Sequence, residues 1–145
     1  MLSARTLLVA SICLSSASAF AVARGDMAFT SFNADEDGWS IVALTELTSH
    51  STLYFTDSNW GGAAFSSAEG FHTWNTGAAS IAAGSVIRFS QIDQASRAVS
   101  VGALSSSGSR ALSSTAETVY AYLGTAANSP TIFLAAVSSE AGAAA

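Results

Sequence analysis

The feature that most constrains this chain is a series of short aliphatic and aromatic runs, each ended by Gly, Asn, Asp or Ser. The clearest run covers residues 85–92, where Ile87, Phe89 and Gln91 alternate with the residues between them. This two-residue period is typical of a β-strand. No stretch of useful length shows the 3.6-residue period of an amphipathic helix. The sequence therefore predicts a chain built from strands.

The predicted strands are separated by turn residues along the whole chain after residue 25. They cover residues 26–32, 39–47, 52–56, 71–74, 85–92, 98–104, 117–123 and 131–137. The serine-rich run 105–109 is expected to be a flexible hairpin loop. About seven or eight short strands with frequent turns predict one all-β domain, a single antiparallel β-sandwich or a partly open barrel.

The N-terminal segment, residues 1–19, has the features of a secretory signal peptide. Arg5 precedes a short apolar core, and Ala17-Ser18-Ala19 is a small-x-small cleavage site. The apolar core is too short to span a bilayer, which requires roughly 20 residues. We therefore expect a secreted, extracellular protein with a domain over residues 20–139, a disordered tail over 140–145 and no membrane span after cleavage.

A second interpretation of the N-terminus concerns a different compartment. The sequence Ala17-Ser18-Ala19-Phe20-Ala21 resembles the junction of bipartite presequences in algae with complex plastids, where a transit peptide begins with Phe. The Pro that usually follows two residues later is replaced by Val22. Import into a plastid is therefore the alternative to secretion.

The composition excludes several classes of function. The net charge is -5, and the chain contains no lysine, which excludes a Schiff-base lysine and the lysine of a phosphate-binding loop. Only four arginines lie beyond residue 20, too few for a basic nucleic-acid-binding face. The single cysteine, Cys13, lies within the predicted signal peptide, so disulfides within the domain are excluded. An acidic chain of this kind is not expected to bind nucleic acid.

Several segments carry a resemblance. They are Gly-Asp-Met-Ala-Phe at 25–29 with Phe-Asn-Ala-Asp at 32–35, Leu-Tyr-Phe-Thr-Asp-Ser-Asn-Trp at 53–60, Glu-Gly-Phe-His-Thr-Trp at 69–74, and the runs 112–125 and 131–136. In this order they resemble an uncharacterised β-rich domain of secreted and cell-surface proteins, mainly bacterial. The resemblance implies an extracellular β-domain and no catalytic residues. Because such domains usually continue past the last strand seen here, we expect a minimal or a truncated version.

Two carboxylates and two tryptophans are the candidate binding residues. Asp57 and Glu69 flank the glycine-containing loop that begins at Trp60, and Trp74 follows in the next predicted strand. A carboxylate pair roughly 5–10 Å apart in a cleft is what glycoside hydrolysis requires. The alternative is that both acids hold turns by accepting backbone hydrogen bonds. Exposed tryptophans on a β-sheet can stack on sugars, whereas buried ones belong to the core.

The two histidines support catalysis poorly. His50 is expected in a solvent-exposed loop, and His72 at a half-buried strand position. They lie 22 residues apart without a cysteine nearby, which disfavours zinc. No Gly-x-Ser-x-Gly elbow accompanies them.

One segment has the spacing of a calcium loop. Residues 33–38 place Asn33, Asp35 and Asp37 at alternate positions before Gly38, close to the start of the known calcium-binding pattern. The position where such a loop needs a bidentate Glu is Leu44. A weak calcium site and a polar hairpin turn are therefore both open, and no other cofactor is indicated.

Taken together, these features favour a non-catalytic, secreted β-sandwich that acts as a binding or structural module. The expected partner is a carbohydrate or another extracellular protein. The alternatives are a small hydrolase that uses Asp57 and Glu69, and a plastid-targeted structural or accessory protein.

Overall fold

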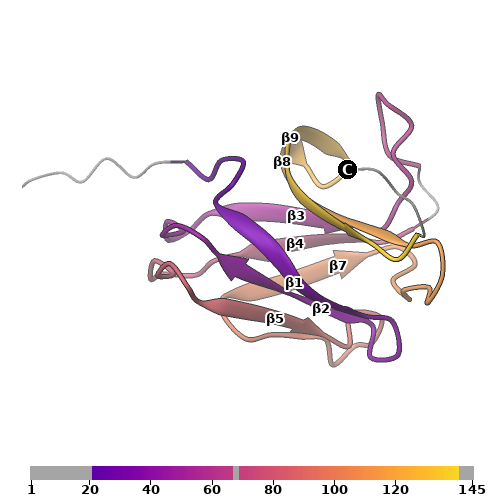
Figure 1. The fold of residues 1–145 in the computed structure, drawn as a ribbon, viewed down its shortest axis with the longest axis horizontal. Coiled ribbons are helices and arrows are strands. Elements are labelled where there is room, and N and C mark those ends of the chain that lie inside the picture. Colours follow the sequence, from indigo (N-terminus) through magenta and orange to yellow (C-terminus); the bar gives the residue numbers. More distant parts are fainter. Residues whose placement is uncertain (1–20, 67–68, 141–145) are drawn as a thin grey trace, which may run out of the picture.

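The computed structural model describes residues 21–66 and 69–140, so the predicted signal peptide lies outside it. The described residues form nine strands and no helix. All strand pairs are antiparallel, and the strands divide into two sheets (Figure 1). The prediction of an all-β sandwich is therefore confirmed, and the two separate sheets exclude a closed barrel. Within the same residues, no helix is long and apolar enough to cross a membrane.

One sheet has four strands and the other has five. The four-stranded sheet has the order β1 (Met27–Asn33), β2 (Gly38–Ala43), β5 (Val86–Ser90) and β6 (Ala98–Val99). The five-stranded sheet has the order β7 (Ala103–Ser107), β4 (Phe71–Asn75), β3 (Thr52–Thr56), β8 (Thr118–Ala126) and β9 (Ser129–Ser138). The connection from β2 to β3 is one of the places where the chain passes from one sheet to the other.

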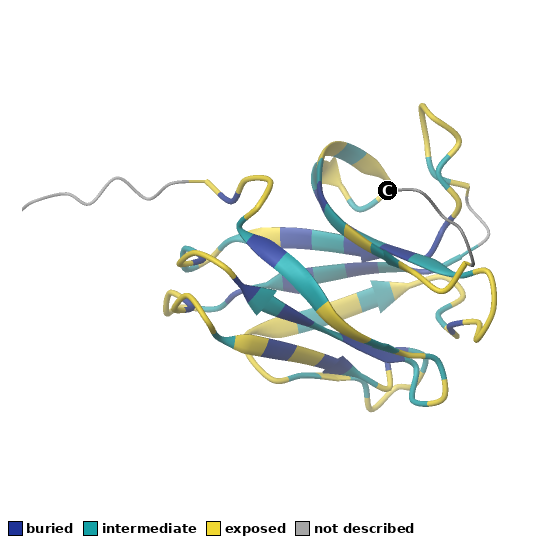
Figure 2. Cartoon of the chain, in the orientation of Figure 1, coloured by how far each residue is buried: buried dark blue, intermediate teal, exposed yellow. Residues whose placement is uncertain are grey.

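The core lies between the sheets because each strand turns alternate side chains inward. Its centre is a set of aromatic contacts across the sandwich. The ring of Trp39 in β2 lies 5.3 Å from both Phe55 in β3 and Phe89 in β5, centroid to centroid. Trp74 in β4 lies 5.4 Å from Phe89 in an edge-to-face arrangement. Buried residues lie on strands of both sheets, whereas the connecting turns are mostly exposed (Figure 2).

Residues 105–107 belong to strand β7, which corrects that part of the predicted flexible loop over 105–109, while Gly108 and Ser109 lie outside the strand. Its residues pair in unbroken register with β4, from Phe71 opposite Ser107 to Asn75 opposite Ala103. Gly102 provides the sharp turn before the strand, at a φ of +80°. A Cβ at Gly102 would lie 2.1 Å from the Asn75 carbonyl oxygen, so only glycine fits. The predicted strand 98–104 is accordingly divided between β6 and β7.

Candidate functional site

The outer face of the five-stranded sheet carries a second set of aromatic side chains. Tyr54 stands opposite Tyr122 in β8, and Tyr122 stands opposite Phe133 in β9. Since their neighbours Phe55 and Ala121 are buried toward the core, these rings point to the other face of the sheet. We call the full set the outer aromatic cluster; its members are Tyr54, Trp60, Phe65, Phe71, Tyr120, Tyr122 and Phe133.

A short hairpin over residues 59–66 brings two of these rings onto the sheet. Trp60 pairs with Phe65, and the Gly61 N–H donates to the Ala64 carbonyl at 3.0 Å. The Trp60 ring lies 5.0 Å from the rings of both Phe65 and Phe133. The hairpin and the end of the β8–β9 hairpin project from the same side of the sheet (Figure 1, upper right). The cluster thus joins residues that are far apart in the sequence.

The rings of the cluster differ in exposure. Tyr122 is completely buried, and its hydroxyl donates to the Ala127 carbonyl. Burial, with a smaller contribution from Tyr54, raises the pKa of Tyr122 above its usual value, so it stays neutral. The other six rings are half-buried. The outer aromatic cluster is therefore packed together but still presents aromatic surface to solvent.

The strands beneath the cluster carry no Asp, Glu, Lys or Arg at all. Beside the aromatic rings, the outer face continues with the hydroxyl-bearing side chains of Thr73, Ser105 and Ser107, which we call the hydroxyl strip. Thr73 stands opposite both Tyr54 and Ser105 in the register of the sheet. The face is therefore uncharged, with an aromatic part and a hydroxyl part side by side.

Asp57 lies at the base of the segment that carries the hairpin. Only 5% of its surface is exposed, and its Oδ1 accepts a hydrogen bond from the Gly70 N–H at 3.2 Å. Its Oδ2 is buried without a hydrogen-bond partner among the described residues. Burial, together with the nearby charges of Glu117 and Glu69, raises the pKa of Asp57 to about 7. This carboxyl group therefore keeps its proton to a much higher pH than an exposed aspartate does.

The predicted carboxylate pair is only partly assembled. Glu69 is half-buried and close enough to Asp57 for the two charges to repel each other. Asp57, however, faces the protein interior and holds a loop through Gly70, which is the turn-holding alternative considered from the sequence. A substrate at the surface would not reach its carboxyl oxygens without movement of the chain.

A serine–histidine pair that the sequence did not predict lies between β4 and β7. His72 Nδ1 is 2.8 Å from Ser106 Oγ. His72 is only 1% exposed, which corrects its expected half-buried position, and its ring meets Trp39 edge to face at 5.3 Å. Burial, and to a lesser degree Arg110 and Arg97, lowers the pKa of His72 to about 3. A ring of such low basicity is a poor general base for a serine nucleophile.

The tryptophans predicted for binding have different positions. Trp60 lies half-exposed in the outer aromatic cluster. Trp74 is completely buried, and its indole N–H donates to the Val101 carbonyl at 2.8 Å. As placed, Trp74 belongs to the core and cannot contact a ligand on the surface.

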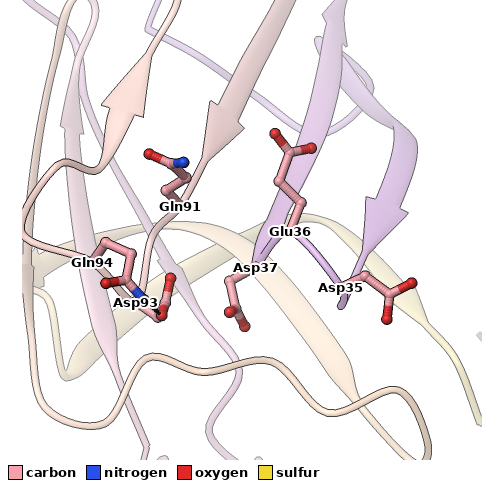
Figure 3. Close-up of a pocket in the computed structure, with 6 residues that line it drawn as sticks. All are labelled: Asp35, Glu36, Asp37, Gln91, Asp93 and Gln94. Carbon is pink, nitrogen blue, oxygen red and sulfur yellow. Dashed lines mark hydrogen bonds between the residues drawn. The ribbon is translucent and has the colours of Figure 1, made fainter.

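The predicted calcium loop connects β1 to β2. Asn33 Oδ1 accepts from the backbone N–H groups of Asp35 and Glu36, and Asp37 Oδ1 accepts from the Leu112 N–H at 2.6 Å. The side chains of Asp35 and Asp37 point in different directions (Figure 3). A hollow of about 360 Å³ beside them is lined by Asp35, Glu36, Asp37, Gln91, Asp93 and Gln94.

These contacts already engage two of the three predicted calcium ligands, Asn33 and Asp37, in holding the backbone. Across residues 21–66 and 69–140, no three His, Cys, Asp or Glu side chains form a group that could hold a metal ion. The turn interpretation therefore accounts for the arrangement, and calcium binding stays a prediction.

Sequence reasoning missed most of the outer aromatic cluster. A signal was present in β8, where Tyr120 and Tyr122 alternate with the core residues Val119 and Ala121. Large aromatic rings on the strand face opposite the core indicate a second packed surface.

Comparison of the chain with protein-family models, with curated proteins and with solved structures found no match. The resemblance to the β-rich domain of secreted and cell-surface proteins therefore stays a prediction.

Proposed function

We propose that the protein is a non-catalytic, exported binding module that holds its ligand at the outer aromatic cluster. The observation that carries the proposal is six half-buried aromatic rings, each still partly open to solvent, gathered on one sheet face whose strands carry no charged side chain. Contiguous exposed apolar surface on a small protein commonly marks an interaction site. Aromatic rings also contribute large contact areas while losing few rotamers on binding.

The test uses one residue that is accessible and one matched control. Trp60 is half-buried but partly open to solvent in the cluster, whereas Val86 is 58% exposed on the opposite sheet. The purified protein should bind at least one probe from a panel of polysaccharides and extracellular matrix proteins. Trp60→Ala should weaken that binding at least tenfold, and Val86→Ala should leave it unchanged. Equal binding by both variants would reject the cluster as the binding site.

A second candidate function is a small hydrolase, and a specific observation favours it. Asp57 has a pKa raised to about 7, as expected of a carboxyl group that donates a proton at neutral pH. Asp57→Asn and Glu69→Gln should then each abolish hydrolysis of glycoside substrates. The hydrolase is rejected if the wild-type protein turns over no substrate in such a panel.

The compartment decides which ligands are available. Secretion is our proposal, and plastid import is its alternative because of the sequence around Phe20. A fluorescent fusion of the full-length chain distinguishes the two, since fluorescence accumulates either in the medium or in the plastid.

A further inference from the structure

We infer that the ligand of the outer face is a neutral polysaccharide, whose chain lies across the outer aromatic cluster and the hydroxyl strip. This inference rests on the proposed function and names the class of ligand. It is carried by the register of the five-stranded sheet, by the chemistry of the side chains along it and by the charge of the chain.

The side chains follow a fixed order across the sheet. Five cross-strand neighbours form one row on the outer face, in the order Phe133, Tyr122, Tyr54, Thr73 and Ser105. Because Tyr122 is completely buried where Phe65 packs on it, the part of the row open to a ligand runs from Tyr54 through Thr73 to Ser105, about 10 Å at the usual strand spacing of roughly 4.8 Å. The row runs from aromatic rings to hydroxyl groups without an interruption by a charged residue.

The aromatic and hydroxyl parts of this row match the two kinds of surface that a sugar presents. A pyranose ring has an apolar face of C–H groups, which packs on an aromatic ring, and a rim of hydroxyl groups. Serine and threonine hydroxyls both donate and accept hydrogen bonds, as sugar hydroxyls do. Trp60, Phe71 and Tyr54 supply half-buried rings that are still partly open to solvent, and the hydroxyl strip supplies the polar partners.

The hydroxyl groups of the strip are available to a ligand. Ser105 and Ser107 are exposed, and neither they nor Thr73 form a side-chain hydrogen bond with any residue that the structure describes. Ser106, which points to the other face of β7, is instead used by His72. The fold therefore uses none of the hydroxyl groups of the strip in a hydrogen bond among the described residues.

The charge of the chain favours a neutral ligand. Anionic polysaccharides are usually bound by arginine and lysine, but the chain has no lysine and a net charge of -5. Arg24 lies at the rim of the row, where its Nε donates to the Phe133 carbonyl at 3.1 Å. An acidic protein with an uncharged face favours a neutral chain over an anionic one.

The experiment measures binding of the purified protein to hydroxyethyl cellulose and mannan as neutral probes and to alginate as an anionic probe, by affinity electrophoresis. An extracellular matrix extract serves as the protein probe. The variants are Trp60→Ala, the double variant Thr73→Val with Ser105→Ala, and the control Ser31→Ala, an exposed serine of β1. Circular dichroism and thermal melting confirm that each variant folds.

We expect a neutral probe to bind, and both Trp60→Ala and the double variant to weaken it about tenfold. For the double variant, a tenfold weakening is the effect expected when two hydrogen bonds are lost. Ser31→Ala should bind like wild type.

Three results would overturn the inference. Binding of alginate or a matrix protein alone, lost in Trp60→Ala, would reject the neutral ligand and retain the proposed function. Binding of a neutral probe that the double variant does not affect would reject the hydroxyl strip. If no probe binds through Trp60, both the inference and the proposed function are rejected.

Discussion

The carboxyl group of Asp57 accepts a hydrogen bond from the Gly70 N–H at 3.2 Å, across 13 residues of chain. This contact joins the two ends of the segment that carries Trp60 and Phe65 onto the sheet. The neighbouring Thr56 hydroxyl donates to the Gly70 carbonyl at 2.6 Å and strengthens the same junction. A buried, titratable side chain therefore helps to hold the part of the outer aromatic cluster that Trp60 and Phe65 contribute.

Our first prediction is that Asp57 makes the protein less stable as the pH rises. Burial raises its pKa in the folded state to about 7, against an ordinary value of 3.8. Well below pH 3.8 the group is protonated in both states and costs nothing. As the pH rises toward 7, ionisation favours the unfolded state by at most about 4 kcal/mol.

The measurement is urea unfolding of wild type and Asp57→Asn between pH 4 and pH 8. The amide mimics the neutral acid, so the variant should be closest to wild type in stability at pH 4 and exceed its stability most at pH 8. Asp35→Asn, an exposed acid, is the control and should not show this growing difference. A constant difference between Asp57→Asn and wild type would contradict the raised pKa.

The second prediction concerns the other half of the same junction. A Cβ on Gly70 would lie 2.3 Å from the Ser109 carbonyl oxygen, which belongs to the backbone and cannot rotate away. Gly70→Ala should therefore reduce the free energy of unfolding by about 1–3 kcal/mol. Gly61→Ala in the exposed hairpin, whose nearest atom lies at 3.3 Å, should have little effect on thermal melting. Equal melting temperatures for the two variants would contradict this packing.

The third prediction separates the three tryptophans. Trp39 and Trp74 are 2% and 0% exposed, so replacing either by alanine should cost about 3–5 kcal/mol. Trp60 is only partly buried, so Trp60→Ala should cost only about 1–2 kcal/mol. Far-UV circular dichroism during urea unfolding measures each cost. A loss at Trp60 as large as that at Trp74 would indicate that the cluster is primarily structural.

The fourth prediction concerns the loop between β1 and β2. Asp37 accepts a hydrogen bond from the Leu112 N–H, which would be left without its charged partner in Asp37→Ala. We expect this variant to lose about 1.5–3 kcal/mol of stability in the absence of calcium. Asp35→Ala, which removes an exposed side chain, should lose much less.

Calcium itself provides the contrasting measurement for this loop. If the segment is a structural turn, millimolar calcium should produce neither heat in calorimetry nor a rise in melting temperature. A rise that disappears in the combined variant Asp35→Ala with Asp37→Ala would instead support the calcium site predicted from the sequence.

The fifth prediction concerns the N-terminus. Cleavage after Ala19 should remove residues 1–19 from the native protein. N-terminal sequencing of protein isolated from its source should therefore begin near Phe20. A sequence that begins at Met1 would contradict both secretion and plastid import.

The strands were largely predictable because their information is local. Alternation over 85–92 and the aliphatic and aromatic runs at 52–56 and 117–123 lie within or around the observed strands β5, β3 and β8. The exception is β7, whose serine-rich sequence predicts a loop. It becomes a strand because its backbone completes the hydrogen bonding of β4, and such pairing outweighs an unfavourable local preference.

The candidate site was only partly predictable. The sequence pointed to the loop between β3 and β4 through Asp57, Trp60 and Glu69. It did not indicate the other aromatic rings that pack around that loop. Alternation divides a strand into two faces without saying which one meets the core. In β3 both faces carry large residues, Leu53 and Phe55 on one side and Tyr54 on the other.

The amino-acid sequence by itself determined the class of this protein: short strands, one acidic domain and an N-terminal segment with the features of an export signal. The tertiary structure decided which tryptophan is accessible, that His72 is neutral and that Asp57 has a raised pKa. These properties depend on burial and on charges brought near by other strands. Both arise from contacts between residues distant in the sequence, which no local pattern encodes.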